Sequence, residues 1–220
     1  MDDDLGRILG SLVRIINVKM KLKICQISDI ETASKLVRMG VDYLGFHIID
    51  KMDMCRVEKI ASINVQLRKN GYSGGTLLTK IKNPADVVKL AKYGHFQYLQ
   101  MHRNLNLSQI EYLADALHHN GIKYIQVIDP ESKSKVYVNC TLNLVDYVLY
   151  DNYEGGTGRQ IPDHNLVGFP MSRAFLAGGI NDVKALKIKE QHNPYAIDVQ
   201  SWVHYDAVDF SKVSRLLSTK

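Results

Sequence analysis

The chain has 220 residues, of which 45% are hydrophobic, and its formal net charge at neutral pH is +5. This length fits one large α/β barrel or two small domains, and the hydrophobic share is enough for a substantial core. No apolar run approaches the roughly 20 residues that cross a bilayer, so we expect no membrane partner. The basic residues are scattered, which favours a small anionic substrate over nucleic acid as the binding partner.

The chain contains three cysteines, Cys25, Cys55 and Cys140. Their spacing is not that of a metal site, and three thiols cannot all pair with one another. We therefore expect no bound metal and a reducing, cytoplasmic location.

Residues 1–19 form an N-terminal extension in our interpretation. Apolar residues recur in it with helical spacing, whereas its acidic start does not fit a secretory signal, which begins with basic residues. Met20 directly precedes the first predicted strand and would itself make a natural protein start. The extension is thus either an added amphipathic helix or the result of a start assigned too early.

From residue 20 onward, apolar runs typical of strands alternate with segments typical of helices. The predicted strands are 22–27, 43–49, 76–81, 96–101, 123–128, 145–150, 173–177 and 195–199. The predicted helices include 57–68, 132–142, 183–191 and 210–217, one that begins at Pro84, and two that stop at Gly40 and Gly121. Two pairs have the spacing of a capping box and predict helix starts, namely Ser28 with Glu31 and Ser108 with Glu111.

Eight strands that alternate with helices within about 200 residues predict a single parallel (β/α)₈ barrel over residues 20–220. An open, doubly wound sheet is the alternative. In a barrel the chemistry sits at the carboxyl ends of the strands, and phosphate usually binds near strands seven and eight. Cys25 follows the first predicted strand, Asp151 the sixth, and Gly178 and Gly179 the seventh.

Glycines follow two of these strands closely and can present backbone N–H groups to an anion. One group, at residues 155–158, comes shortly after Asp151, and the other is the pair Gly178 and Gly179. An acid, a thiol and two glycine-rich anion sites at the strand ends predict chemistry on a phosphosugar.

Six short motifs, in order along the chain, carry a resemblance to a known family. They are Lys23-Ile24-Cys25, Asp42-Tyr43-Leu44-Gly45-Phe46, Gln100-Met101-His102, Asp151 with Gly155-Gly156-Thr157-Gly158, Leu176-Ala177-Gly178-Gly179-Ile180-Asn181 and Asp198-Val199. From about Lys21 to the C-terminus, the chain resembles phosphoribosylanthranilate isomerase, an enzyme of tryptophan biosynthesis. The resemblance implies a cofactor-free Amadori rearrangement of N-(5-phosphoribosyl)anthranilate by a monomer or homodimer.

The resemblance also implies roles for single residues. Asp151 is the expected general acid, with a pKa raised by burial, and Cys25 the expected general base, with a pKa lowered by a positive neighbour. Arg56 is the expected partner of the substrate carboxylate. His102 is expected to line the site as a core or supporting histidine, and Asp198 to support loop structure. Further substrate-binding residues are expected at the phosphate, namely Gly156, Gly158, Gly178, Gly179 and Ser201.

From the residues alone, other interpretations stay open: Cys25 as a small core residue, Asp151 as a turn cap and Arg56 as a solvated arginine. The chain also departs from the family pattern at four positions, Gln26, Arg103, Gln200 and Trp202. We expect the Trp202 indole to crowd the phosphate. An isomerase for another phosphosugar and a non-catalytic barrel that binds a phosphorylated metabolite are therefore the alternative functions.

Overall fold

Eight parallel strands close into a barrel, in the order β1 to β8, in the computed structural model, which describes residues 19–49, 53–152 and 161–220. The strands are β1 (Lys21–Ile24), β2 (Tyr43–His47), β3 (Gly75–Thr79), β4 (Tyr98–Met101), β5 (Lys123–Ile128), β6 (Tyr147–Tyr150), β7 (Ala174–Leu176) and β8 (Ala196–Val199). β8 pairs with β1 and completes the ring. The predicted (β/α)₈ barrel is confirmed, and the sheet is not open.

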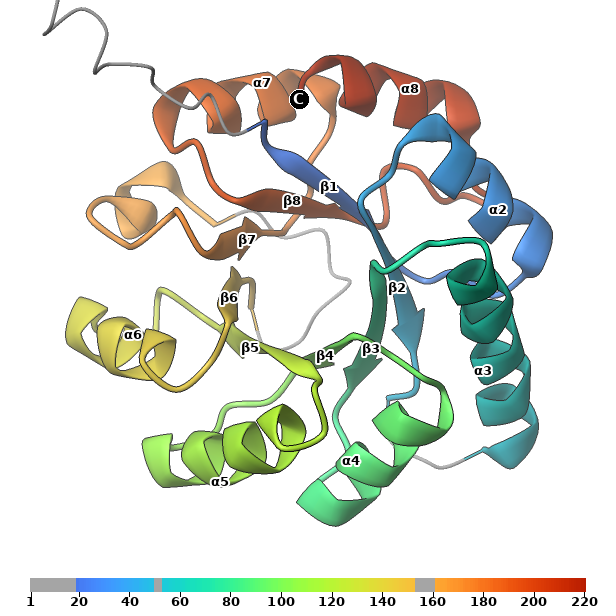
Figure 1. Cartoon of the computed structure of the whole chain (residues 1–220). Coiled ribbons are helices and arrows are strands. Elements are labelled where there is room, and N and C mark those ends of the chain that lie inside the picture. The colour runs from blue at the N-terminus through green and yellow to red at the C-terminus, as the bar shows by residue number, and fades with distance from the viewer. Residues whose placement is uncertain (1–18, 50–52, 153–160) are drawn as a thin grey trace, which may run out of the picture.

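Helices surround the ring of strands (Figure 1). They are α2 (Ile30–Met39), α3 (Met54–Lys69), α4 (Pro84–Tyr93), α5 (Leu107–His118), α6 (Lys135–Leu142), α7 (Asp182–Gln191) and α8 (Phe210–Ser218), with the short 3₁₀ helix η1 (Asp163–Leu166) before β7. Within the described residues, no helix is long and apolar enough to cross a membrane.

The strands are buried on both faces, as parallel strands covered by helices must be. β3, for example, is buried at all five positions. Outward-facing side chains such as Phe46 and Leu77 pack under the helices, whereas a second, smaller apolar cluster around Phe175 fills the barrel interior. This double burial explains why the strands read in the sequence as continuous apolar runs rather than as alternating ones.

Two predicted helix caps are wrong by one or two residues. The Asp29 carboxylate, not Ser28, caps α2 and accepts a hydrogen bond from the backbone N–H of Thr32. Asn106, not Ser108, caps α5 in a reciprocal box with Gln109. A cap must directly precede the first helical residue, and Asp and Asn serve there as well as Ser does, so spacing alone did not choose between neighbouring candidates.

The start of α3 also differs from the prediction. Asp53 caps this helix, so Arg56 and its neighbours form the first helical turn instead of a loop. The first strand is shorter than predicted because Gln26 adopts a left-handed conformation with φ of 65°, which ends the extended chain directly after Cys25.

Three of the sequence predictions lie outside the described residues. They concern the N-terminal extension up to residue 18, the glycine group at residues 155–158, and its two predicted site residues, Gly156 and Gly158. The site at the barrel mouth is therefore built from the remaining residues.

Candidate active site

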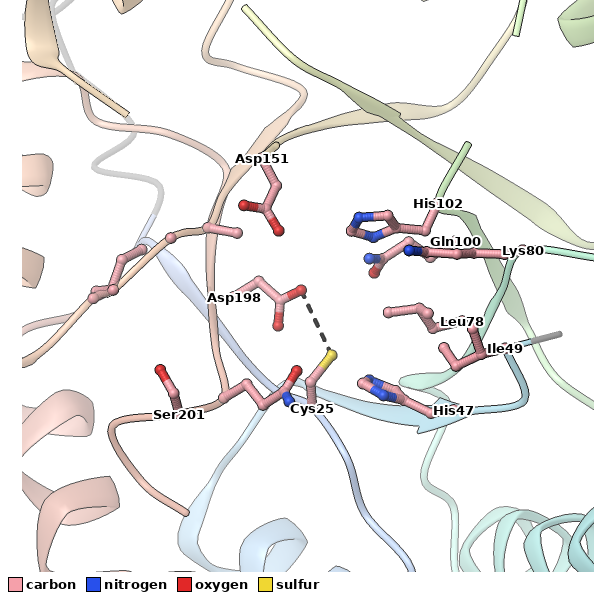
Figure 2. A pocket seen from close by; sticks show the side chains of 15 residues that line it. Cys25, His47, Ile49, Leu78, Lys80, Gln100, His102, Asp151, Asp198 and Ser201 are labelled. Atoms are coloured by element: carbon pink, nitrogen blue, oxygen red, sulfur yellow. Dashed lines mark hydrogen bonds between the residues drawn. The ribbon is translucent and has the colours of Figure 1, made fainter. Parts of the chain in front are cut away.

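A cavity of about 260 Å³ opens at the carboxyl ends of the strands and is sized for a small molecule. Figure 2 shows its side chains converging from opposite sides of the ring. The lining residues are Cys25, His47, Ile49, Leu78, Lys80, Gln100, His102, Asp151, Ala177, Gly178, Gly179, Ile180, Asp198, Gln200 and Ser201. The prediction that Cys25 and Asp151 share one mouth of the barrel is thus confirmed.

A buried ion pair lies at the base of this cavity. The Lys23 side chain is completely buried and its Nζ lies 2.6 Å from Asp198 Oδ2. The same ammonium donates to Gln100 Oε1 and to Cys25 Sγ, each at 2.7 Å, so all three of its donors are used. The Cys25 thiol lies 3.6 Å from Asp198 Oδ2, the contact dashed in Figure 2. Lys23, Cys25 and Asp198 therefore form one charge cluster.

Sequence reasoning missed two members of this cluster. In the sequence Lys23 is only part of a motif, and Asp198 is expected to support loop structure, whereas in the structure both side chains reach the interior of the barrel. A signal for Lys23 was present, because residues two apart on a strand point to the same face, and Cys25 was already expected to point inward.

The Cys25 thiol is not activated in the way the sequence suggested. Burial raises its pKa to about 12, and the nearby Asp198 carboxylate adds to this effect, whereas the Lys23 ammonium opposes it. The expected lowering of the Cys25 pKa is therefore wrong. The positive neighbour is present, but burial and a carboxylate outweigh it, and the resting side chain is a protonated thiol.

Asp151 behaves as predicted. Its side chain is only 9% exposed, and burial raises its pKa to about 7, although the backbone N–H of Asn152 opposes the shift by donating to Oδ1 at 2.9 Å. A carboxyl group with this pKa is partly protonated at neutral pH and can donate a proton, as a general acid must.

Two histidines line the opposite side of the cavity as neutral imidazoles. Burial lowers the pKa of His47 to about 3 and that of His102 to about 4. His102 Nε2 donates to the backbone carbonyl of Asn152 at 3.1 Å, which ties β4 to the chain just after Asp151. His102 thus lies where expected, whereas His47 was not predicted.

The approach of the thiol to β2 requires a glycine at position 45. A Cβ atom there would lie 2.4 Å from Cys25 Sγ, far closer than van der Waals contact allows. Any side chain at Gly45 would therefore displace the thiol from the cavity.

The strand β7 ends on two glycines with positive φ, Gly178 at 93° and Gly179 at 56°. Among the described residues, neither of their backbone N–H groups has an acceptor. Both glycines line the cavity together with Ser201, and they lie shortly before α7, whose N-terminus favours negative charge. The residues after β7 and β8 that the sequence predicts to bind phosphate, Gly178, Gly179 and Ser201, thus lie together at the cavity.

Two residues lie away from the cavity. Arg56 is exposed on the first turn of α3 and does not line the cavity. The Trp202 indole packs between Lys212 and Arg215 of α8, whose charged groups lie 5.6 and 5.3 Å from its ring centroid. The expectation that Trp202 crowds the phosphate is therefore wrong, because its side chain turns outward onto the helix.

Two of the departures from the family pattern contact each other at the rim. Gln200 Nε2 donates to Gln26 Oε1 at 2.8 Å and links the residues that follow β1 and β8. Arg103, the remaining departure, contributes its backbone carbonyl to Gln126 and lies outside the cavity lining. The substituted positions thus alter the rim while the acid and the thiol stay in place.

The chain matches the family model described as N-(5'-phosphoribosyl)anthranilate (PRA) isomerase over residues 22–217. An enzyme of that name from Bacillus thuringiensis is 26% identical over 207 residues, which cover 90% of this chain and 96% of the relative. The crystal structure of phosphoribosyl anthranilate isomerase from Thermus thermophilus superimposes with a TM-score of 0.74 at 22% identity, over 91% of this chain and 98% of the other.

A second solved phosphoribosyl anthranilate isomerase holds reduced 1-(o-carboxyphenylamino)-1-deoxyribulose 5-phosphate. It matches with a TM-score of 0.70 at 18% identity, over 91% of this chain and 97% of the other. At these identities the two structures support the fold alone, whereas the family match covers nearly the whole barrel.

Proposed function

The chain belongs to the N-(5'-phosphoribosyl)anthranilate isomerase family, and we propose that it rearranges N-(5'-phosphoribosyl)anthranilate in tryptophan biosynthesis. The observation that carries the proposal is an acid with a pKa of about 7, Asp151, and a thiol, Cys25, at strand ends around one cavity. The ligand of a structural relative, an arylamino ribulose phosphate, supports the same class of substrate here.

Asp151 acts as the general acid in the first step. It donates its proton to the ring oxygen of the ribose while the C1'–O4' bond breaks and the nitrogen lone pair forms a C=N bond. A base then removes the proton from C2', and the electrons of that C–H bond move to give an enolamine, which becomes the ketone product. Each positioned proton transfer is worth about 10²–10⁴-fold in rate.

Cys25 acts as the base at C2' and must lose its own proton first. The Lys23 ammonium, 2.7 Å from Sγ, stabilises the thiolate, and the thiol proton leaves the cluster for solvent. The active form, with Asp151 protonated and Cys25 ionised, is a minor one because the pKa of the acid is below that of the base. Its share is constant between the two pKa values and falls at lower pH.

The other side chains hold the two ends of the substrate. Backbone N–H groups of Gly178 and Gly179, with the Ser201 hydroxyl, bind the phosphate, and Gly156 and Gly158 are proposed to complete this cradle. His102 lines the cavity near the acid.

Arg56 remains a proposed partner for the carboxylate through its long-range charge, which is among those that lower the His47 pKa. We place the protein in the cytoplasm as a monomer or homodimer acting without a cofactor. The three free cysteines fit a reducing compartment.

The test is turnover of N-(5'-phosphoribosyl)anthranilate by the pure protein, followed through the loss of substrate fluorescence. Turnover that disappears in Asp151→Ala supports the proposal. A folded protein that turns over another aminoribose phosphate but not this one selects the alternative substrate, and binding of ribose 5-phosphate without turnover of either selects the non-catalytic alternative.

A further inference from the structure

We propose that His47 is a substrate-binding residue that donates a hydrogen bond from Nε2 to the carboxylate on the aromatic end of the substrate. The inference deepens the proposed function and rests on it. It assigns the discrimination between carboxylated and plain aryl amines to one side chain of β2.

The first observation is an unsatisfied atom. His47 is the last residue of β2 and lines the cavity, and its Nε2 is shielded from solvent and has no hydrogen-bond partner among the described residues. Buried polar atoms in native proteins nearly always have a partner, and leaving one unmet is costly. At a cavity wall, a ligand is the natural source of the missing partner.

The second observation is the position of this side chain. His47 lies two residues after Gly45, so it faces the same interior, one pleat above the glycine that contacts the Cys25 thiol. Ile49 follows one pleat further along, and Leu78 is the register partner of His47 on β3. An imidazole flanked by two aliphatic side chains fits an aromatic ring that carries a polar group.

The third observation is the distribution of charge around the cavity. Both lining carboxylates, Asp151 and Asp198, come from β6 and β8, whereas the ionisable lining residues that come from β2 to β4 are nitrogen groups, namely His47, Lys80 and His102. Figure 2 shows the two sets facing each other. If the phosphate binds at the glycines after β7, the other anionic group of the substrate points toward β2–β4, where it meets nitrogen groups and no carboxylate among the described lining residues.

The imidazole suits this role because it is neutral. Burial lowers the pKa of His47 to about 3, and the charges of Lys23 and Arg56 act in the same direction. A neutral ring can carry its proton on Nε2 and donate it without the desolvation of a cation. The charges of Lys23 and Arg56 also attract the carboxylate at long range, whereas His47 makes the direct contact.

The experiment compares two substrates in two matched variants. The substrates are N-(5'-phosphoribosyl)anthranilate and its aniline counterpart, which lacks the carboxylate. In His47→Asn the side-chain amide nitrogen takes the position of Nδ1 and cannot reach the ligand. In His47→Gln the amide nitrogen extends to the position of Nε2 and can donate in its place. For the anthranilate substrate we expect His47→Asn to raise KM about 10- to 100-fold, with kcat within about threefold, and His47→Gln to recover most of the loss. For the aniline substrate neither variant should change KM.

An equal rise in KM for both substrates, or a fall in kcat at constant KM, would overturn the assignment. Turnover by the original chain reports separately on the proposed function. If that turnover is absent, the proposed function fails, and fluorescence titration with free anthranilate then judges His47: weaker binding in His47→Asn than in His47→Gln supports it, and equal binding refutes it. Thermal unfolding of each variant establishes that both are folded.

Discussion

The two ends of the barrel interior differ in how far their buried polar groups are hydrogen-bonded. At the amino end, alternate strands contribute a layer of tyrosines, Tyr43, Tyr98 and Tyr147 at the starts of β2, β4 and β6, and Tyr195 just before β8. Their rings pack with each other and with Phe175 at centroid distances from 4.7 to 6.3 Å. Tyr195 joins the Tyr43 and Tyr147 hydroxyls through hydrogen bonds of 2.5 and 3.4 Å. We call these four residues the tyrosine layer.

At the carboxyl end, the polar groups are buried without full compensation. His47 Nε2 and Asp198 Oδ1 have no partner among the described residues, and burial keeps Asp151 near a pKa of 7 and Cys25 near 12. The difference shows how one repeated strand pattern divides its tasks: the amino end contributes stability, and the carboxyl end retains costly groups that chemistry needs.

The largest expected effect is on catalysis at the carboxyl end. Cys25→Ser and Asp151→Asn should each lower kcat at least about 10²- to 10⁴-fold, because each removes one positioned proton transfer. The kcat/KM of the original chain should fall as the pH drops through about 7. Below this pH both Asp151 and Cys25 are protonated, whereas the active form carries a proton on Asp151 alone. Steady-state assays between pH 5 and 9 check both, and turnover that survives either substitution would refute the mechanism.

The next effect concerns the buried ion pair. Lys23→Met should destabilise the protein by about 3–5 kcal/mol, because it leaves the Asp198 carboxylate buried and unpaired. Lys21→Met is the matched control on the same strand: its Nζ lies 3.1 Å from Asp42 but its side chain is 39% exposed, so the cost should stay below about 1 kcal/mol. Urea unfolding measures both, and similar values would mean that the cluster contributes no more than a surface pair.

The strand ends, and with them Cys25, Asp151, Gly178 and Gly179, could be predicted from the sequence. Strands buried on both faces appear as continuous apolar runs, and glycines mark the turns that follow them. The charge cluster and the pKa of Cys25 could not be predicted from the sequence. Lys23 and Asp198 are 175 residues apart and meet only when β8 closes on β1, and the burial that raises the Cys25 pKa is a property of the closed barrel.

The departures from the family pattern show the same limit. Gln26 and Gln200 read as two separate losses of family residues, yet they contact each other at the rim. Trp202 reads as an obstruction, yet its side chain turns toward α8. The direction of a side chain and the partner it meets are set by the tertiary structure, which no local motif encodes.

A third prediction concerns the loss of folding stability caused by ionisation of the buried Asp151 carboxyl. Burial raises its pKa from 3.8 to about 7, so the folded state holds this proton more tightly than the unfolded chain. Stability must then fall as the pH rises from about 4 to 7 and stay level above 7. At about 1.4 kcal/mol per pH unit, the loss is at most about 4 kcal/mol. Asp151→Asn should therefore be more stable than the original chain at pH 8 and equal to it near pH 4. Urea unfolding at both pH values checks this, and a variant less stable at pH 8 would contradict it.

The smallest effect belongs to the tyrosine layer. Tyr195→Phe removes the hydroxyl that joins Tyr43 and Tyr147, and Tyr43 is only 6% exposed, so its buried hydroxyl loses its closest hydrogen-bond partner. We expect a loss of about 1–3 kcal/mol in stability and no change in kcat or KM. Tyr147→Phe removes only the longer contact and should cost less, because Tyr147 is partly exposed. Thermal unfolding measures the stability of each variant, and parallel activity assays measure kcat and KM. A change in kcat in Tyr195→Phe would show that the amino end of the barrel also supports the reaction.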